Sequence, residues 1–205
     1  VLGVALGVGS FLSVLSITSG FQDEFRNKVL GVNAHVIVFK YGLDWPGGDK
    51  LFPESAPGRR IRVTGIVTDF KGEPVPDALI EFWQADAAGR FGAARQGVSA
   101  GFGRVPTDET GRYTIHSIYP GRVAGPDGRM QAPHILVVLF ARGLLAQVVT
   151  RMYFDGDAAN QDDPVLALCG ARAATLIAKG DAIDANAYIW NISLQGGNET
   201  VFFDA

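Results

Sequence analysis

Short runs of alternating apolar and polar residues recur between turn signals from residue 59 to the end of the chain. In the first run, RIRVTGIVTD, Ile61, Val63 and Val67 fall on one face of an extended strand. Arg62 and Thr64 fall on the other face, because successive side chains of a strand point to opposite sides. Similar runs occur in DALIEFWQAD, GRYTIHSIYPG and QVVTRMYFDGD. The pattern predicts an all-β fold, an antiparallel β-sandwich.

Three segments of the body depart from this alternation. The run HILVVLFARG is apolar without interruption, which predicts a strand buried on both faces. The C-terminal run AYIWNISLQGGNETVFF predicts a hairpin that turns around Gln195–Asn198. The segment CGARAATLIAKGD, residues 169–181, predicts the one short helix of the sandwich.

The N-terminal part of the chain has a different character. Its first twenty residues carry no charge, and an uncharged apolar run of about 18 or more residues is a candidate membrane span. In the following segment FQDEFRNKVLGV, Phe21, Phe25 and Val29 fall at helical spacing with charged residues between them, as on an amphipathic helix. We therefore expect an apolar and amphipathic helical extension over residues 1–40.

A stretch rich in proline, glycine and charge separates this extension from the sandwich. It reads YGLDWPGGDKLFPESAPGRR, and such breakers are typical of loops. The predicted organisation is thus an extension, a linker or loop over residues 41–58, and a β-sandwich over residues 59–205.

Composition excludes some classes of function. The 205 residues carry a formal net charge of -3, and lysine and arginine are scattered rather than gathered in a stripe, so no nucleic-acid partner is expected. The single cysteine, Cys169, cannot form an intrachain disulfide and has no metal or redox spacing around it. This cysteine usage fits a reducing compartment, and we expect a cytoplasmic protein.

Four blocks of the body resemble the intradiol aromatic-ring dioxygenases. They are RIRVTGIVTDFKGEPVPDALIEFWQADAAGRF, TDETGRYTIHSIYPG, APHILVVLFARGLLAQVVTRMYFDGD and YIWNISLQGGNETVFFDA, in this order along the chain. Within that family, the segment Asn198–Asp204 and the run Phe140–Gly143 are similar to the alpha-type chains of its protocatechuate-cleaving branch. The resemblance implies a prealbumin-like sandwich and a part in O₂-dependent ring cleavage.

The resemblance also implies where iron would be held. Catalytic chains of the family hold non-haem Fe(III) with two tyrosines and two histidines, and the matching positions here are Phe91, Val123, His134 and Leu136. His134 is the one residue of the four that can ligate a metal. The resemblance therefore implies that this chain binds no metal and has no catalytic residue of its own. His134 is then expected to be a core or interface histidine.

A beta-type partner chain would hold the Fe(III), in a higher oligomer of alpha–beta protomers, by the same resemblance. The small aromatic substrate would be protocatechuate, cleaved to 3-carboxy-cis,cis-muconate. Arg142, in the run LFARG, matches an arginine at the substrate pocket, where its forked donors suit a carboxylate. The alternative for Arg142 is an ordinary cation at a strand end or interface.

The extension resembles a second family. The run LGVALGVGSFLSVLSITSGFQDEFRNKVLGVNAHVIVF is similar to the first transmembrane segment of lipoprotein-releasing ABC transporter permeases. A permease needs several spans, so we interpret residues 1–40 as a fusion or chimera; the alternative is a glycine-rich hydrophobic hairpin of a soluble domain. This run stands where alpha-type chains carry a Thr-Pro-Ser-Gln-Thr…Gly-Pro-Tyr segment, and weaker activity than that of a complete alpha-type chain is expected.

Two functions of other classes stay open on the residues alone. The body would serve as a non-catalytic β-sandwich that only binds a partner, since a fold does not specify a function. Alternatively, the chain would be an interaction domain anchored in a membrane through residues 1–19.

Overall fold

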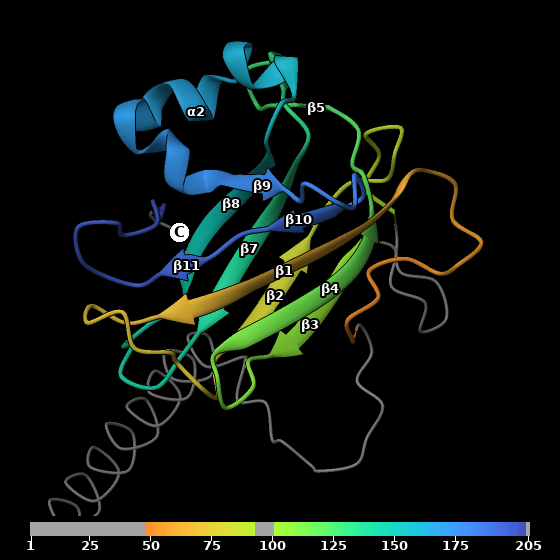
Figure 1. The fold of residues 1–205 in the computed structure, drawn as a ribbon. Coiled ribbons are helices and arrows are strands. Elements are labelled where there is room, and N and C mark those ends of the chain that lie inside the picture. Colours follow the sequence, from red (N-terminus) through yellow and green to blue (C-terminus); the bar gives the residue numbers. More distant parts are fainter. Residues whose placement is uncertain (1–47, 93–100, 204–205) are drawn as a thin grey trace, which may run out of the picture. The chain divides into compact units, whose positions relative to one another are not determined.

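The computed structural model describes residues 48–92 and 101–203, so the expected extension over residues 1–40 lies outside the described residues (Figure 1). The strands are β1 (Arg60–Thr68), β2 (Leu79–Trp83), β3 (Phe102–Pro106), β4 (Arg112–Ile118), β5 (Val123–Ala124), β6 (Met130–Gln131), β7 (His134–Phe140), β8 (Val148–Phe154), β9 (Ile177–Gly180), β10 (Ala187–Ile189) and β11 (Ile192–Ser193). A helical segment between β8 and β9 consists of η1 (Ala158–Asp162), α2 (Pro164–Cys169) and η2 (Gly170–Leu176), where η marks a 3₁₀-helix.

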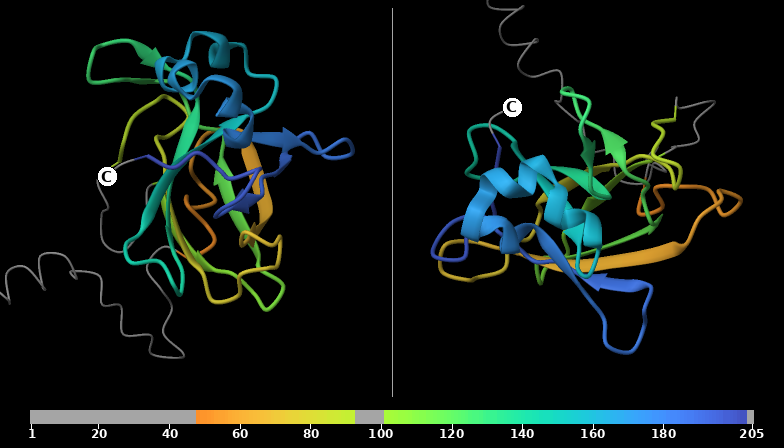
Figure 2. Two further views of the ribbon diagram at one scale, coloured as in Figure 1. Left: turned by 90° about the vertical axis from the view of Figure 1, so that its left-hand side faces the viewer. Right: turned by 90° about the horizontal axis from the view of Figure 1, so that it is seen from above.

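The strands form two layers that face each other. One layer contains β4, β1, β10 and β11, and the other contains β3, β2, β7 and β8, while β9 pairs with both β10 and β8 and joins the layers. Figure 2 shows the two layers from the side, with the helical segment over one end. The predicted β-sandwich is therefore present, and α2 is its one short α-helix among the described residues.

The pairing is mixed rather than antiparallel, which corrects the sequence prediction. Strand β1 runs parallel to β10 and β11, and β8 runs parallel to β9. A parallel return needs a long crossover, and the helical segment between β8 and β9 provides one. The predicted hairpin is also wrong as a strand pair, because β11 pairs with β1 and Phe203 instead forms a bridge with Val149.

The short α-helix lies earlier in the chain than the predicted segment, residues 169–181. Residues 170–176 form the 3₁₀-helix η2 and residues 177–180 form a strand, so the α-helix ends where we expected it to begin. The Asp163 side chain caps α2 by accepting hydrogen bonds from the N–H groups of Val165 and Leu166, and Pro164 stands at the first helical position. Gly170, at φ 55°, then ends the α-helix.

The hydrophobic core fills the space between the layers. It gathers the apolar face of each major strand, including Ile61 and Val63 of β1, Ile80 and Phe82 of β2, Ile115 of β4, Ile135, Val137 and Leu139 of β7, and Met152 and Phe154 of β8. The expectation that β7 is buried on both faces is wrong. Every second residue from His134 to Phe140 is only half-buried, so this strand has a core face and a partly open outer face.

The segment before β1 is a loop, as its breakers predict, but it is not a free linker. Leu51 and Phe52 are buried in the core, at 0% and 7% exposure. The Leu51 N–H donates to the His116 carbonyl at 2.9 Å, and the Leu51 carbonyl accepts from the Gly101 N–H at 2.9 Å. The sandwich therefore includes residues before position 59.

One buried hydroxyl joins the segments on the two sides of β1 and gives a first prediction. The Tyr113 hydroxyl donates to the Trp190 carbonyl at 2.7 Å, in the core. Replacing Tyr113 by phenylalanine leaves that carbonyl without this donor and is expected to lower the free energy of unfolding by about 1–3 kcal/mol. Urea unfolding measures the change. The matched variant Tyr188→Phe, whose hydroxyl accepts from the Arg59 guanidinium at 2.9 Å in a less buried place, is expected to cost less.

Candidate functional site

The four positions matched to iron ligands come together at the start of β7. Phe91, Val123, His134 and Leu136 all line one pocket of about 210 Å³. Val123 belongs to β5, His134 and Leu136 to β7, and Phe91 to the loop after β2. The wall of this pocket also contains Trp83, Gln131 and Arg151.

Two close loop approaches put Phe91 and Val123 in the same place. A Cβ atom on Gly89 would lie 2.0 Å from the Arg122 carbonyl oxygen, and Gly89 has a φ of 75°. A Cβ atom on Gly121 would lie 2.4 Å from the Gly89 backbone nitrogen. Only glycine fits at such contacts, so the loop that carries Phe91 can lie directly against the segment that leads into Val123.

His134 has a defined hydrogen-bond partner. Its Nδ1 lies 2.8 Å from the Ala132 carbonyl, which can only accept, so Nδ1 carries the proton and Nε2 presents a lone pair. Burial lowers the pKa of His134 below its ordinary value, and the nearby Arg151 guanidinium lowers this pKa further. The ring also packs against Tyr153, with 5.5 Å between ring centroids. His134 is therefore a neutral imidazole whose ring is held by the hydrogen bond to Ala132 and the contact with Tyr153.

Arg151 is the residue of this pocket that the sequence did not identify. Its β8 position pairs with Leu136 of β7, so both side chains lie on the outer face of the same sheet. The Arg151 Nη1 donates to the Gln131 side-chain oxygen at 3.1 Å. The signal in the sequence was a charged residue inside the run QVVTRMYF, but its location depends on the register between two strands.

The side chains of this pocket do not suit ferric iron. His134 offers one nitrogen donor, while Phe91, Val123 and Leu136 offer none, and the Arg151 guanidinium brings a positive charge. Ferric iron needs several oxygen or nitrogen donors, with enough negative charge to offset its own. No group of three or more His, Cys, Asp or Glu placed to hold a metal occurs within residues 48–92 and 101–203.

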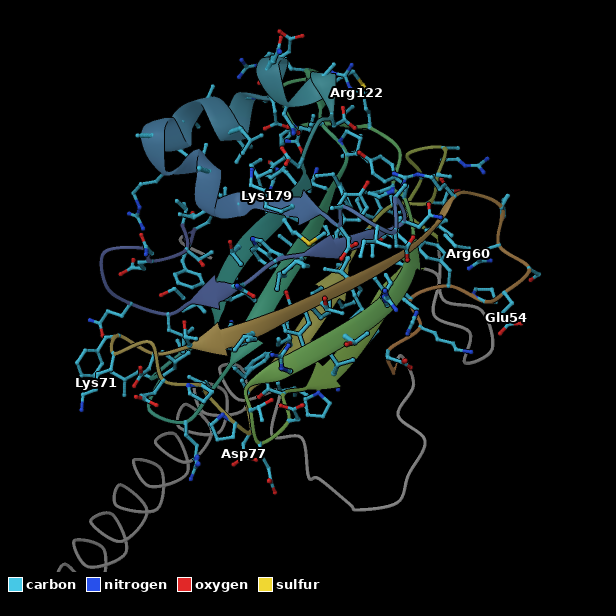
Figure 3. All side chains as sticks on the ribbon, viewed as in Figure 1. Glu54, Arg60, Lys71, Asp77, Arg122 and Lys179 are labelled. Carbon is cyan, nitrogen blue, oxygen red and sulfur yellow. The ribbon has the colours of Figure 1, made fainter. Side chains whose placement is uncertain are left out.

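Arg142 lies far from this pocket. It follows the end of β7, whose first residue is His134, and roughly 20 Å of strand separates the two ends of β7. Its side chain is 81% exposed, and the guanidinium forms an ion pair with Asp77 at 3.3 Å. In Figure 3, Asp77 and Arg122, a neighbour of the pocket, stand at opposite ends of the sandwich. The structure does not bring Arg142 together with the other matched positions.

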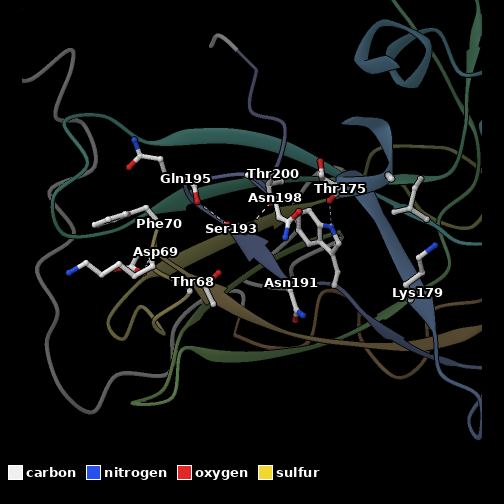
Figure 4. A pocket seen from close by; sticks show the side chains of 17 residues that line it. Thr68, Asp69, Phe70, Thr175, Lys179, Asn191, Ser193, Gln195, Asn198 and Thr200 are labelled. Atoms are coloured by element: carbon white, nitrogen blue, oxygen red, sulfur yellow. Dashed lines mark hydrogen bonds between the residues drawn. The ribbon is translucent and has the colours of Figure 1, made fainter. Parts of the chain in front are cut away.

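A larger hollow of about 630 Å³ lies between the end of β1, η2 and the loop after β11 (Figure 4). Its polar groups largely bond to one another: the Trp190 indole donates to the Thr175 carbonyl at 3.0 Å, and the Ser193 N–H donates to the Thr200 hydroxyl at 3.0 Å. Of the residues that the sequence singled out for function, none lines this hollow.

The neutral state of His134 gives a second prediction. The unfolded chain takes up a proton at an ordinary histidine pKa of about 6.5, while the folded imidazole, whose pKa is lowered, stays neutral to lower pH. Protons therefore favour the unfolded state, and stability is lost as the pH falls below about 6.5. His134→Gln should make the fall in unfolding free energy between pH 7.5 and 5.5 smaller. An unchanged fall in the His134 variant contradicts the prediction.

Comparisons with known proteins agree with this architecture. The family model described as Dioxygenase matches residues 49–196. The chain is 44% identical over 159 residues to a protocatechuate 3,4-dioxygenase alpha chain of Burkholderia cepacia, which covers 73% of this chain and 79% of the relative. It is 40% identical over 119 residues to the beta chain of the same organism, covering 53% of this chain and 50% of that one.

A solved structure shows the same fold. The dioxygenase domain of a dioxygenase–carbohydrate-binding protein fusion from Streptomyces sp. SirexAA-E aligns with a TM-score of 0.59 and 28% identity. The alignment covers 78% of this chain and 93% of that domain.

A minor part of the chain is similar to a transporter protein. Over 48 residues it is 42% identical to the lipoprotein-releasing system transmembrane protein LolC of Xylella fastidiosa, which is 22% of this chain and 12% of that protein. In the part of the chain that the structure describes, no helix has the length and apolar character needed to cross a membrane. The family model covers most of the chain by contrast, and its relatives share the sandwich described above. The chain therefore belongs to the intradiol dioxygenase family.

Proposed function

We propose that this chain is the alpha-type subunit of a protocatechuate 3,4-dioxygenase and holds no iron itself. The observation that carries the proposal is the pocket at the start of β7, where the four matched positions offer a single donor, His134, beside the Arg151 guanidinium. The identity to a named alpha chain supports the same assignment. The chain then contains no catalytic residue and acts by supporting a partner.

The partner in this proposal is a beta-type chain that holds the Fe(III). The two chains form alpha–beta protomers that assemble further in the cytoplasm. Together they catalyse the cleavage of protocatechuate by O₂, between the two carbons that carry its hydroxyl groups, and the product is 3-carboxy-cis,cis-muconate. The similarity of this chain to both an alpha and a beta chain supports a protomer built from two related sandwiches.

Arg142 is the residue of this chain that we assign to the substrate. Its guanidinium is exposed, and its ion pair with Asp77 joins two exposed groups, so that pair contributes little and leaves the forked donors available. A guanidinium binds a planar carboxylate through two parallel hydrogen bonds. Because Arg142 lies at the opposite end of β7 from this chain's own pocket, its role would be exercised on substrate held by the partner.

Ring-cleavage activity with and without a beta-type chain tests the proposal. The full chain alone is expected to consume no O₂ with protocatechuate, whereas the co-expressed and co-purified pair consumes O₂ and forms 3-carboxy-cis,cis-muconate. Activity of the chain alone would show that it contains its own catalytic centre. Failure to co-purify with any beta-type chain would instead favour a binding module without a role in catalysis.

A further inference from the structure

The pocket at the start of β7 carries a positive charge on its wall. Among the described residues that line it, Arg151 is the charged one, and none is an aspartate or glutamate. The Arg151 Nη1 donates to the Gln131 side-chain oxygen at 3.1 Å and, over a longer 3.5 Å, to the Tyr153 hydroxyl. Both partners are uncharged side chains. The Tyr153 hydroxyl in turn donates to the Asp163 carboxylate at 3.2 Å, but Asp163 does not line the pocket, so the guanidinium is the charge that faces a ligand and favours an anion.

Most of the donors of Arg151 are free to bind a ligand. Its hydrogen bonds to the described residues all leave from Nη1, and none of these residues accepts from Nε or Nη2. The five N–H groups of a guanidinium form a planar fork that fits a carboxylate. Arg151 is half-buried, and a partly buried charge is screened less by salt than an exposed one.

The size and walls of the pocket restrict what can accompany the carboxylate. A cavity of roughly 150 Å³ holds one benzene molecule, and this pocket has about 210 Å³. Its wall contains the rings of Trp83 and Phe91 and the apolar Leu136. The Trp83 ring packs against Phe102, with 4.2 Å between ring centroids, and this contact with a residue outside the pocket lining helps to fix the position of the Trp83 ring.

We propose that this pocket binds a single-ring aromatic carboxylate. The Arg151 guanidinium binds the carboxylate group, and the Trp83 and Phe91 rings flank the aromatic ring. The His134 Nδ1 donates to the Ala132 carbonyl at 2.8 Å, so its Nε2 is the ring nitrogen left to accept a hydrogen bond from a ring hydroxyl. The site belongs to this chain alone, so the proposal goes beyond the function proposed above and its failure would leave that function untouched.

Calorimetric titration of the full chain with benzoate tests this site. Benzoate is expected to bind saturably, and acetate and benzyl alcohol, which lack the ring and the charge respectively, are each expected to bind at least about tenfold more weakly. Benzoate should also shift the imidazole signals of His134 in the NMR spectrum. The absence of saturable benzoate binding would overturn the proposal. Acetate binding as tight as that of benzoate would mean an adventitious ion only.

Variants of one residue locate the binding. Arg151→Gln should weaken benzoate binding at least about tenfold, because the charge-assisted hydrogen bonds are lost. Arg151→Lys keeps the charge but not the fork and should give a smaller loss, which covers the case in which the glutamine variant does not fold. Arg62→Gln, an equal charge change on β1 where the side chain pairs with Asp184, should leave affinity unchanged. Equal binding by the wild type and both Arg151 variants would contradict the site.

Discussion

In the complex with a beta-type chain, Arg142→Ala is expected to raise the KM for protocatechuate about ten- to a hundredfold, with a much smaller change in kcat. A hydrogen bond to a charged group contributes about 1.5–3 kcal/mol, and Arg142 offers a bidentate one. The carboxylate of the substrate does not take part in the reaction. Removing its arginine partner therefore weakens the binding of the substrate and of the transition state by a similar amount. Steady-state kinetics of the purified pair measures both constants.

Two controls separate this role from that of an ordinary surface cation. Arg62→Ala removes another exposed arginine that is paired with an aspartate, at 3.6 Å from Asp184, and should leave KM as it is. Catechol lacks the carboxylate, so the KM for catechol should respond little to Arg142→Ala. An unchanged KM for protocatechuate, or an equal rise for both substrates, would show that Arg142 does not bind the carboxylate.

The largest expected loss of stability follows from Asp163→Ala. This side chain is fully buried and accepts four hydrogen bonds: from the Ala132 N–H at 2.7 Å, the Tyr153 hydroxyl at 3.2 Å, and the Val165 and Leu166 N–H groups at 2.9 Å each. The change removes a helix cap and leaves several buried donors unsatisfied, which together should cost about 3–5 kcal/mol. Guanidinium or urea unfolding of the full chain measures this loss.

A second capping aspartate provides the matched control. Asp157 caps η1 by accepting from the Ala159 N–H at 2.9 Å, and it also accepts from the Tyr119 hydroxyl at 2.6 Å, but it is only half-buried. Asp157→Ala should therefore cost about 1 kcal/mol, as an ordinary cap does. Equal losses for the two variants would mean that Asp163 acts only as a cap and does not tie α2 to the strands beside the pocket.

The strands could be predicted from the sequence where one face is buried in the core and the other is exposed to solvent. β1 and β4 alternate in the sequence and in burial, because each has a core face and an outer face. The helical segment was harder to predict. Residues 170–176 are rich in alanine and have high helical propensity, but the α-helix begins earlier in the chain, where Asp163 caps it and Pro164 is its first residue. The parallel strand pairs could not be read from a local pattern, since they depend on how distant segments meet.

The candidate site was predictable only in part. The resemblance identified the four matched positions, and the fold brings Phe91, Val123, His134 and Leu136 to one pocket. Arg151 was missed because its location opposite Leu136 is fixed by strand register, which no short motif encodes. The burial of Leu51 was missed for a similar reason: breakers around it predict a loop, and they do not say that the loop packs against β4.

The measurement that tests the central claim most directly is the iron content of the purified full chain and of its complex with a beta-type chain. Elemental analysis of both samples gives the number of iron atoms per chain. The account predicts no iron in the chain alone and one Fe(III) for each alpha–beta pair, because the pocket of this chain offers one imidazole and a guanidinium. Stoichiometric iron in the chain alone, or two iron atoms for each pair, would contradict it.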